Sequence, residues 1–232
     1  MIQKRRLPWL LTLALVIFGG GSEAQQAPLQ PVLEQLDRTS ASFHDAQAAF
    51  VWDQYQKVVD EHDLQKGTVY FRRTGSGVQM AADISDPMPP KYVLYSESKV
   101  QIYQPKIDQV TQYNTGKDKA AFESFLVLGF GGSGRDMLKS FDVTYAGKET
   151  LDNVDTAKLD LVPKSEKARN TFSHIMLWID TARGVSVQQQ FFTASGDYRL
   201  AKYTGIQINQ RVPDSVFKLK TTGKTKVVSP QG

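Results

Sequence analysis

Residues 67–113 read GTVYFRRTGSGVQMAADISDPMPPKYVLYSESKVQIYQPKIDQVTQY, and this stretch decides the fold. Apolar and more polar side chains alternate from Val78 to Ser85. Alternation with a period of two gives a strand one apolar and one polar face. Turn sequences at Gly75-Ser76-Gly77 and Glu97-Ser98 separate this strand from further short strands at residues 64–73, 92–96, 100–103 and 109–113. The stretch therefore predicts a meander of consecutive antiparallel strands.

A helix and a further strand precede the meander. Apolar residues at helical spacing predict one amphipathic helix over about residues 30–41; they are Leu29, Val32, Leu33 and Leu36. Residues 43–59 are rich in β-branched and aromatic side chains and are joined to residues 64–73 by the polar segment 60–63. This arrangement predicts a β-hairpin.

The hydrophobic period changes after the meander, near Lys117. Residues 121–128 and 137–141 have helical spacing, and strands are predicted again at 141–151, 156–162, 171–180, 185–193 and 198–209. A sheet of about ten sequential antiparallel strands should curl, and the two helical stretches are available to cover its concave face. We expect a mainly β (α+β) protein with one large curved antiparallel sheet, forming an unclosed β-barrel with a helical lid.

The first residues predict export. A basic segment at residues 4–6, an apolar segment at 7–18 and small residues at 19–22 are typical of a secretory signal peptide, here residues 1–24. Residues 25–232 are then expected to form a single domain. Without cysteine the chain has no site for a lipid anchor, a disulfide or a thiolate-bound metal. We therefore expect a soluble monomer in the periplasm.

The charge does not favour nucleic acid as a partner. The net charge of the whole chain is +4, and the signal peptide removes three basic residues and one acid, which leaves +2. A basic run at residues 218–226 is expected to be a solvated tail, with contact to anionic lipid headgroups as the alternative.

One glycine-rich segment matches a nucleotide-binding pattern. Gly129-Phe-Gly-Gly-Ser-Gly134 fits G-x-G-x-x-G, but that mechanism needs a preceding strand and a βαβ unit. Because residues 122–128 have helical spacing, the segment is interpreted as a flexible joint between two helical pieces.

No constellation of residues points to catalysis or to a metal. The three histidines, His44, His62 and His174, lack metal-ligand spacing. The acidic residues at 60–63 and at 152 and 155 are interpreted as turn residues rather than calcium ligands. Neither Ser76 nor Ser133 completes G-x-S-x-G. We expect no catalytic residue, no cofactor and no enzymatic activity.

Large apolar side chains on the strands have two interpretations. The residues are Phe50, Trp52, Phe71, Met80, Ile84 and Trp178. Most should form an ordinary core. A single curved sheet with only two short helices nevertheless has more apolar concave surface than those helices can fill, which indicates a ligand cavity.

An ordered series of short motifs suggests a family. The series is Gly67-Thr-Val-Tyr-Phe-Arg-Arg73, Tyr92-Val-Leu-Tyr-Ser-Glu-Ser-Lys-Val-Gln-Ile-Tyr-Gln-Pro105, Gln109-Val-Thr111, Leu159-Asp-Leu-Val-Pro-Lys164 and Val216-Phe217. Over residues 29–228 the chain resembles the LolA family of periplasmic lipoprotein carriers. The resemblance implies an unclosed barrel with a helical lid over an apolar cavity, and a role for Arg73 in tying the barrel to backbone carbonyls of the lid. The chain departs from the family at Thr74, at the glycines 75 and 77, and at Glu97-Ser98.

The resemblance also implies a function. It predicts a chaperone that binds lipoprotein acyl chains and carries them between an inner-membrane releasing complex and an outer-membrane acceptor. A lipid- or lipoprotein-sensing regulatory module of the same fold is the alternative, and an envelope enzyme is a third hypothesis. The candidate lipid-binding residues are Arg73, Phe50, Trp52, Phe71, Val78, Met80, Ile84, Tyr95, Phe122 and Phe125.

Overall fold

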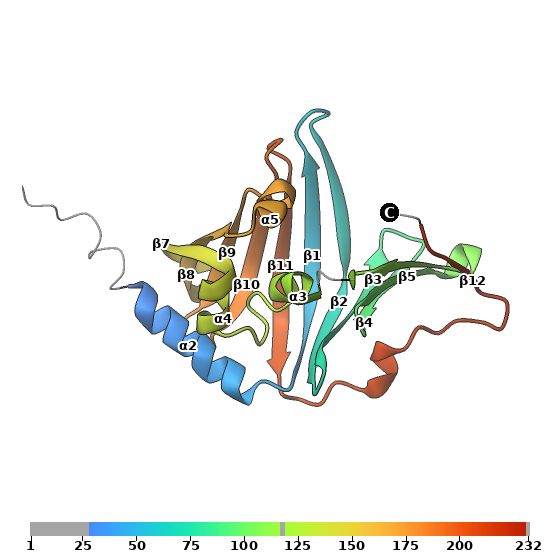
Figure 1. The fold of residues 1–232 in the computed structure, drawn as a ribbon, viewed down its shortest axis with the longest axis horizontal. Coiled ribbons are helices and arrows are strands. Elements are labelled where there is room, and N and C mark those ends of the chain that lie inside the picture. The colour runs from blue at the N-terminus through green and yellow to red at the C-terminus, as the bar shows by residue number, and fades with distance from the viewer. Residues whose placement is uncertain (1–27, 117–118, 231–232) are drawn as a thin grey trace, which may run out of the picture.

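The computed structural model describes residues 28–116 and 119–230, so the predicted signal peptide lies outside the described residues. Within them, one sheet of twelve strands runs in the order β12-β6-β5-β4-β3-β2-β1-β11-β10-β9-β8-β7. The sheet curves without closing, and β7 and β12 form its two ends (Figure 1). All neighbouring pairs are antiparallel except β12 and β6, which are parallel. The expected unclosed antiparallel sheet is therefore confirmed.

The sheet is built from two runs of consecutive strands. The first run is β1 (Asp45–Gln56), β2 (Glu61–Thr74), β3 (Gly77–Asp86), β4 (Lys91–Ser96), β5 (Lys99–Gln104) and β6 (Gln109–Asn114). The second is β7 (Phe141–Leu151), β8 (Val154–Pro163), β9 (His174–Asp180), β10 (Val185–Phe192) and β11 (Tyr198–Ile208). Pairing of β1 with β11 joins the two runs, so residues from both ends of the chain meet at the centre of the sheet.

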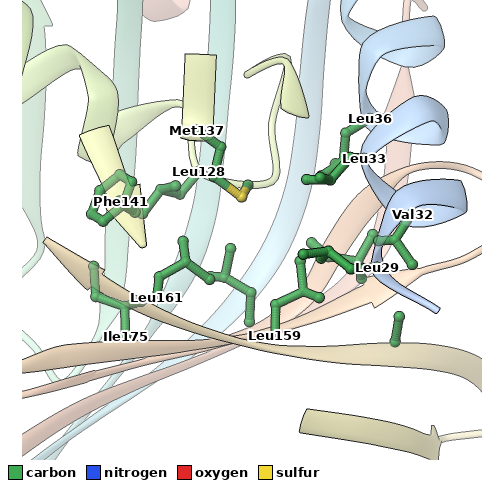
Figure 2. Close-up of a cluster of buried hydrophobic side chains, with 13 residues drawn as sticks. Leu29, Val32, Leu33, Leu36, Leu128, Met137, Phe141, Leu159, Leu161 and Ile175 are labelled. Atoms are coloured by element: carbon green, nitrogen blue, oxygen red, sulfur yellow. The ribbon is translucent and has the colours of Figure 1, made fainter. Parts of the chain in front are cut away.

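Helices cover one face of the sheet, which we call the inner face. They are α2 (Leu29–Ser42), α3 (Lys119–Leu126) and α4 (Gly134–Ser140), and all three were expected from the sequence. The apolar side of α2 packs with α4 against strands β8 and β9, as Figure 2 shows for Leu33, Met137 and Leu159. The spacing of three and four residues puts the apolar side chains of α2 on one side of the helix.

The strand predicted at residues 171–180 begins later in the structure than the sequence indicated. Residues 171–180 were expected to be extended throughout, but Thr171 ends a short helix, α5 (Glu166–Thr171), and β9 begins at His174. The Arg169 side chain caps the preceding turn by donating to the carbonyls of Pro163 and Lys164, at 2.9 and 2.8 Å. A serine followed by glutamate at 165–166 is a helix-start signal that could have revealed α5.

The C-terminal segment is not a free tail. Residues 209–225, with a 3₁₀ turn at Asp214–Phe217, lie against the outer face of β2, β3 and β4, and β12 (Lys226–Val228) then pairs with β6. Asp108 holds this segment by accepting hydrogen bonds from the hydroxyls of Thr222 and Thr225 at 2.5 and 2.6 Å. The lysines of the run are exposed as expected, but the backbone is fixed, which sequence patterning alone did not predict.

No helix in the described ranges has both the length and the apolar character required to cross a bilayer.

Candidate functional site

A cavity of about 350 Å³ lies between the inner face of the sheet, the helix α3 and Phe172, the residue that follows α5. Four of the predicted ligand-binding residues line it: Trp52, Phe71, Met80 and Phe125. The other apolar lining residues were not predicted from the sequence; they are Val69, Leu126, Phe172, Phe191, Leu200, Ala201 and Tyr203. The size falls at the small end of the range typical of ligand pockets.

Strand register explains the open space at the centre of the sheet. Trp52 of β1 lies opposite Gln65 of β2 on one side and Ala201 of β11 on the other. All three therefore share the inner face, because directly paired residues point to the same side of a sheet. Ala201 contributes only a methyl group at this position, so the neighbouring strand leaves room above it.

Aromatic rings form the wall opposite the sheet. Phe172, which follows α5, lies between Phe125 of α3 and Phe191 of β10, with ring centres 5.9 and 5.1 Å apart. Ring pairs at such distances attract each other beyond simple area burial. The cavity wall is therefore apolar on several sides and comes from segments far apart in the sequence.

The other predicted residues lie outside the cavity lining. Phe50 and Ile84 are buried in the adjoining core, where Phe50 packs on Trp52 with ring centres 4.3 Å apart. Val78 is half-buried and pairs with Arg73 near the turn between β2 and β3. Phe50 and Ile84 therefore support the cavity wall from the core, and Val78 lies near the turn between β2 and β3.

Tyr95 and Phe122 connect α3 to the sheet. Their ring centres are 5.0 Å apart, and the Tyr95 hydroxyl donates to Oε1 of Glu123 at 2.9 Å. Tyr95 is fully buried, and this burial, together with the hydrogen bond to Glu123, raises the pKa of its hydroxyl to about 12. One end of α3 is also attached by Lys119, whose ammonium group donates to the carbonyl of Ser76 at 2.9 Å.

The Tyr95→Phe variant should change how stability depends on alkaline pH. Because the folded protein keeps the Tyr95 proton up to about pH 12 while the unfolded chain loses it near pH 10, the native state loses stability as the pH rises from 10 towards 12. Phenylalanine cannot ionise, so the variant should lose about 1–2 kcal/mol less between pH 9 and pH 11.5. Urea denaturation at both pH values measures the difference. Exposed Tyr113→Phe is the matched control, and equal losses in the two variants would contradict the prediction.

Three backbone carbonyls of the loop between α3 and α4, those of residues 128, 129 and 131, accept hydrogen bonds from the sheet. The carbonyl of Leu128 accepts from the side-chain amide of Gln189, and that of Gly129 accepts from the backbone N–H of Ser186 at 2.9 Å. The carbonyl of Gly131 accepts from Nη2 of Arg73 at 2.6 Å. The sequence analysis identified only the arginine, because nothing in the sequence of β10 distinguishes Gln189 from its neighbouring glutamines.

The glycine-rich segment joins the two helices α3 and α4, as predicted. Its glycines let it pack closely against the sheet, so the prediction that this joint is flexible is wrong. Gly129 has a φ of +77°, and a Cβ atom there would lie 2.1 Å from Cβ of Ser186. Phe130 between the glycines is buried, stacks on Phe71 at 4.7 Å and meets the edge of Tyr203 at 4.9 Å. The segment before the glycines is the helix α3, which removes the context that nucleotide binding requires.

Arg73 makes the contacts that the family resemblance implied. Besides Gly131, its guanidinium reaches the C-terminal end of α2, donating to the carbonyl of Ser40 at 2.8 Å and to its hydroxyl at 3.1 Å. The chain departs from the family at Thr74, which ends β2, and at Gly75, which lies in the turn to β3. Arg73 makes its hydrogen bonds to Ser40 and Gly131 despite these two departures. Because the residue is largely exposed, water competes for these hydrogen bonds and lowers their net strength.

The cavity has a few polar lining residues beside its apolar ones. Its polar lining consists of Asp53, Gln54, Asp63, Gln65, Gln189 and Arg199, with no serine, threonine, histidine or lysine among the described lining residues. His62 and His174 each pair with one aspartate instead, and the described ranges contain no group of three or more potential metal ligands. Asp60 and Asp152 have positive φ values of 54° and 48° in turns, as expected. Glu61, Asp63 and Asp155 instead lie at or near the starts of strands β2 and β8, so the prediction of turn residues is wrong for these three.

Comparison with known proteins gives a family and several structural relatives. A family model described as uncharacterized protein matches residues 92–212. No curated protein matches the chain. A conserved uncharacterized protein from Thermus thermophilus has a TM-score of 0.55 and 12% identity, over 88% of this chain and 99% of that one. MucB has a TM-score of 0.53 and 12% identity, over 87% and 66%. A LolA superfamily protein from Nitrosomonas europaea has a TM-score of 0.40 and 13% identity, over 82% and 97%.

The unclosed sheet with a helical cover, which the sequence resemblance implied, is the fold observed, and the Thermus thermophilus protein and MucB share it. At these sequence identities the likeness to solved structures concerns the fold alone.

Proposed function

The chain belongs to the family of uncharacterized proteins whose model matches residues 92–212, and we propose that it is a periplasmic carrier of acylated proteins. In this proposal the acyl chains of a lipoprotein enter the cavity, and the carrier moves them from the inner to the outer membrane. The releasing complex of the inner membrane and the acceptor of the outer membrane are its partners. The protein acts as a single exported domain and monomer, without enzymatic activity.

One observation carries the proposal: an apolar cavity lies beneath a helical cover that is held by polar bonds. The cavity lining is mainly aromatic and aliphatic, which suits hydrocarbon. Its cover is tied through carbonyls of the loop 127–132, by Arg73, Ser186 and Gln189. These hydrogen bonds are few, so a ligand that contacts the cavity wall can compensate for their loss when the cover opens.

The energetics of acyl chains explain why a cover is useful. Burial of one CH₂ group contributes about 0.8 kcal/mol, so several long chains in an always-open cavity would bind too tightly to leave. A closed empty state competes with the bound state and lowers the net affinity. Since the observed cavity is small, we propose that α3 and the loop 127–132 move outward together to admit cargo, which breaks the bonds to Arg73, Ser186 and Gln189.

Release of lipoproteins from membranes tests this function. Purified protein is added to spheroplasts that retain outer-membrane-type lipoproteins on the inner membrane, and the soluble fraction is assayed for lipoprotein in complex with it. A carrier should produce a soluble complex and pass the lipoprotein to outer-membrane vesicles. Binding of isolated lipoprotein without any release would contradict transport and favour the sensing module. Native mass spectrometry of the protein purified from its own envelope would identify the acylated species.

Arg73→Leu should bind acyl chains more tightly and deliver them more slowly. The change removes the hydrogen bonds to Ser40 and Gly131, which destabilises the closed empty state. The three charge-assisted bonds of Arg73, weakened by exposure to water, should together contribute about 1–2 kcal/mol, which corresponds to an affinity increase of about 5–30-fold. Fluorescence titration with an acylated peptide gives the affinity, and stopped-flow mixing with acceptor vesicles gives the transfer rate.

Arg72→Leu is the matched control. Arg72 precedes Arg73 but points to the outer face, where its guanidinium lies over Phe217 at 4.4 Å and pairs with Asp214 at 2.6 Å. Its removal should loosen the C-terminal segment without increasing acyl-chain affinity. Equal affinities of Arg73→Leu and the unaltered protein would contradict the role of Arg73 in closing the cover.

A further inference from the structure

Arg199 lies at the mouth of the cavity without a counter-ion. It is on the inner face of β11, two residues before Ala201, and its guanidinium carbon is 5.9 Å from the centre of the Phe172 ring. Over residues 28–116 and 119–230, the Arg199 side chain has no other hydrogen bond, ion pair or ring contact. Arg72 and Arg73 differ, since each donates to a named carboxylate or carbonyl.

Three of the polar lining residues, Gln54, Asp63 and Arg199, lie at the same end of the cavity. Gln54 of β1 pairs with Arg199 of β11 on one side and with Asp63 of β2 on the other, so the three form a polar row on the inner face. The next inward row is Trp52 with Ala201 and Gln65, and farther along β2 the cavity is lined by Val69 and Phe71. Gln189 lies beside Ala201 in that inward row, so the interior is mainly apolar with two glutamines, and the rim is polar, which suits an amphiphile.

The carboxylates near the rim already have partners. Asp63 accepts a hydrogen bond from the Gln65 side chain at 2.8 Å, and Asp53 pairs with His62 at 2.8 Å. Asp63 and Arg199 lie on either side of Gln54, two strand spacings apart, and no ion pair joins them in the part of the chain that the structure describes. The guanidinium is thus the group at the rim that remains available for a charged ligand.

We propose that Arg199 binds the single anionic group, carboxylate or phosphate, of a lipid whose acyl chain occupies the cavity. The inference rests on the proposed acyl-chain cavity and extends its ligands from lipoproteins to free lipids with an anionic headgroup. A planar guanidinium matches both carboxylate and phosphate with paired N–H donors. The Phe172 ring supports the cation from one side and leaves its edge free for the ligand.

The test compares ligands that share a chain and differ in charge. Dodecanoate, dodecyl phosphate and neutral methyl dodecanoate are titrated below their micelle concentrations, with the fluorescence of Trp52 in the cavity wall as the signal. We expect the full-length mature protein to bind the better of the two anions about five- to tenfold more tightly than the ester. Preference for dodecanoate indicates a fatty acid, and preference for dodecyl phosphate indicates a phospholipid.

Variants assign the preference to one side chain. Arg199→Gln should bind methyl dodecanoate as the unaltered protein does and should lose the preference for anions. Lys202→Gln is the matched control, because Lys202 is an exposed cation on the outer face of the same strand and should leave the preference unchanged.

The outcomes separate this inference from the proposed function. If the unaltered protein binds the ester as tightly as both anions, or if Arg199→Gln keeps the preference, the headgroup site is overturned while the cavity stands. If none of the three ligands binds, the acyl-chain cavity is overturned and the headgroup site with it.

Discussion

Replacement of Phe130 by alanine is expected to lower the free energy of unfolding by about 3–5 kcal/mol, the range for truncating a buried phenylalanine. Phe130 is 1% exposed and lies between the rings of Phe71 and Tyr203. Its removal leaves a cavity that the surrounding rings cannot fill, because Phe71 and Tyr203 are held on separate strands of the sheet. Urea denaturation followed by tryptophan fluorescence measures the loss.

The control for this variant is an exposed aromatic residue. Tyr113 on β6 is 45% exposed, and Tyr113→Ala should cost less than about 1 kcal/mol. A loss for Phe130→Ala of the same size as for Tyr113→Ala would show that the loop between α3 and α4 is not anchored by its phenylalanine. The interpretation of the glycine-rich segment as a flexible joint would then regain support.

Ala201→Trp should reduce acyl-chain binding by about 10–100-fold while leaving the protein folded. Ala201 is the smallest residue of the cavity wall and lies opposite Trp52 across the β1–β11 pairing. A tryptophan side chain there would occupy the space of several CH₂ groups of a ligand, each contributing about 0.8 kcal/mol, so a loss of about 1.5–3 kcal/mol is expected. Displacement of a fluorescent fatty acid measures the affinity, and circular dichroism checks the fold.

Ala49→Trp is the matched control for cavity filling. Ala49 lies on the same pair of strands, opposite Thr204, but is exposed on the outer face. It should bind ligands as the unaltered protein does. If Ala201→Trp also keeps full affinity, acyl chains do not occupy this cavity, and the carrier proposal loses its main support.

Local periodicity predicted most of the secondary structure. The alternation from Val78 to Ser85 appears as β3, and the helical spacing from Leu29 to Leu36 appears as α2. Each signal depends only on which side of a strand or helix a residue faces, which spacing along the chain determines. Errors occurred where local signals were weak, at the short helix α5 and at the three-residue strand β12.

The candidate site was predicted in part. The cavity is lined by Trp52, Phe71, Met80 and Phe125. Phe50 and Ile84 are also large apolar residues on predicted strands, but they pack in the core. Sequence cannot separate the two groups, because an inward-facing residue becomes lining or core according to the size of residues on neighbouring strands. The methyl group of Ala201, about 150 residues away in the chain, leaves the space beside Trp52.

The sequence by itself determined the strand and helix periods, the unclosed β architecture with its helical cover, and the position of Arg73 beneath that cover. These follow from local patterning and from a series of short motifs. Only the tertiary structure decided that the glycines at 129 and 131 lie in a loop packed on the sheet, and that Gln189, like Arg73, binds a carbonyl of this loop. It also decided that Arg199 has no counter-ion at the cavity mouth among the described residues. The physical reason is that each of these depends on contacts between strands and helices distant in the chain, and their distances and burial exist only once the sheet has curved.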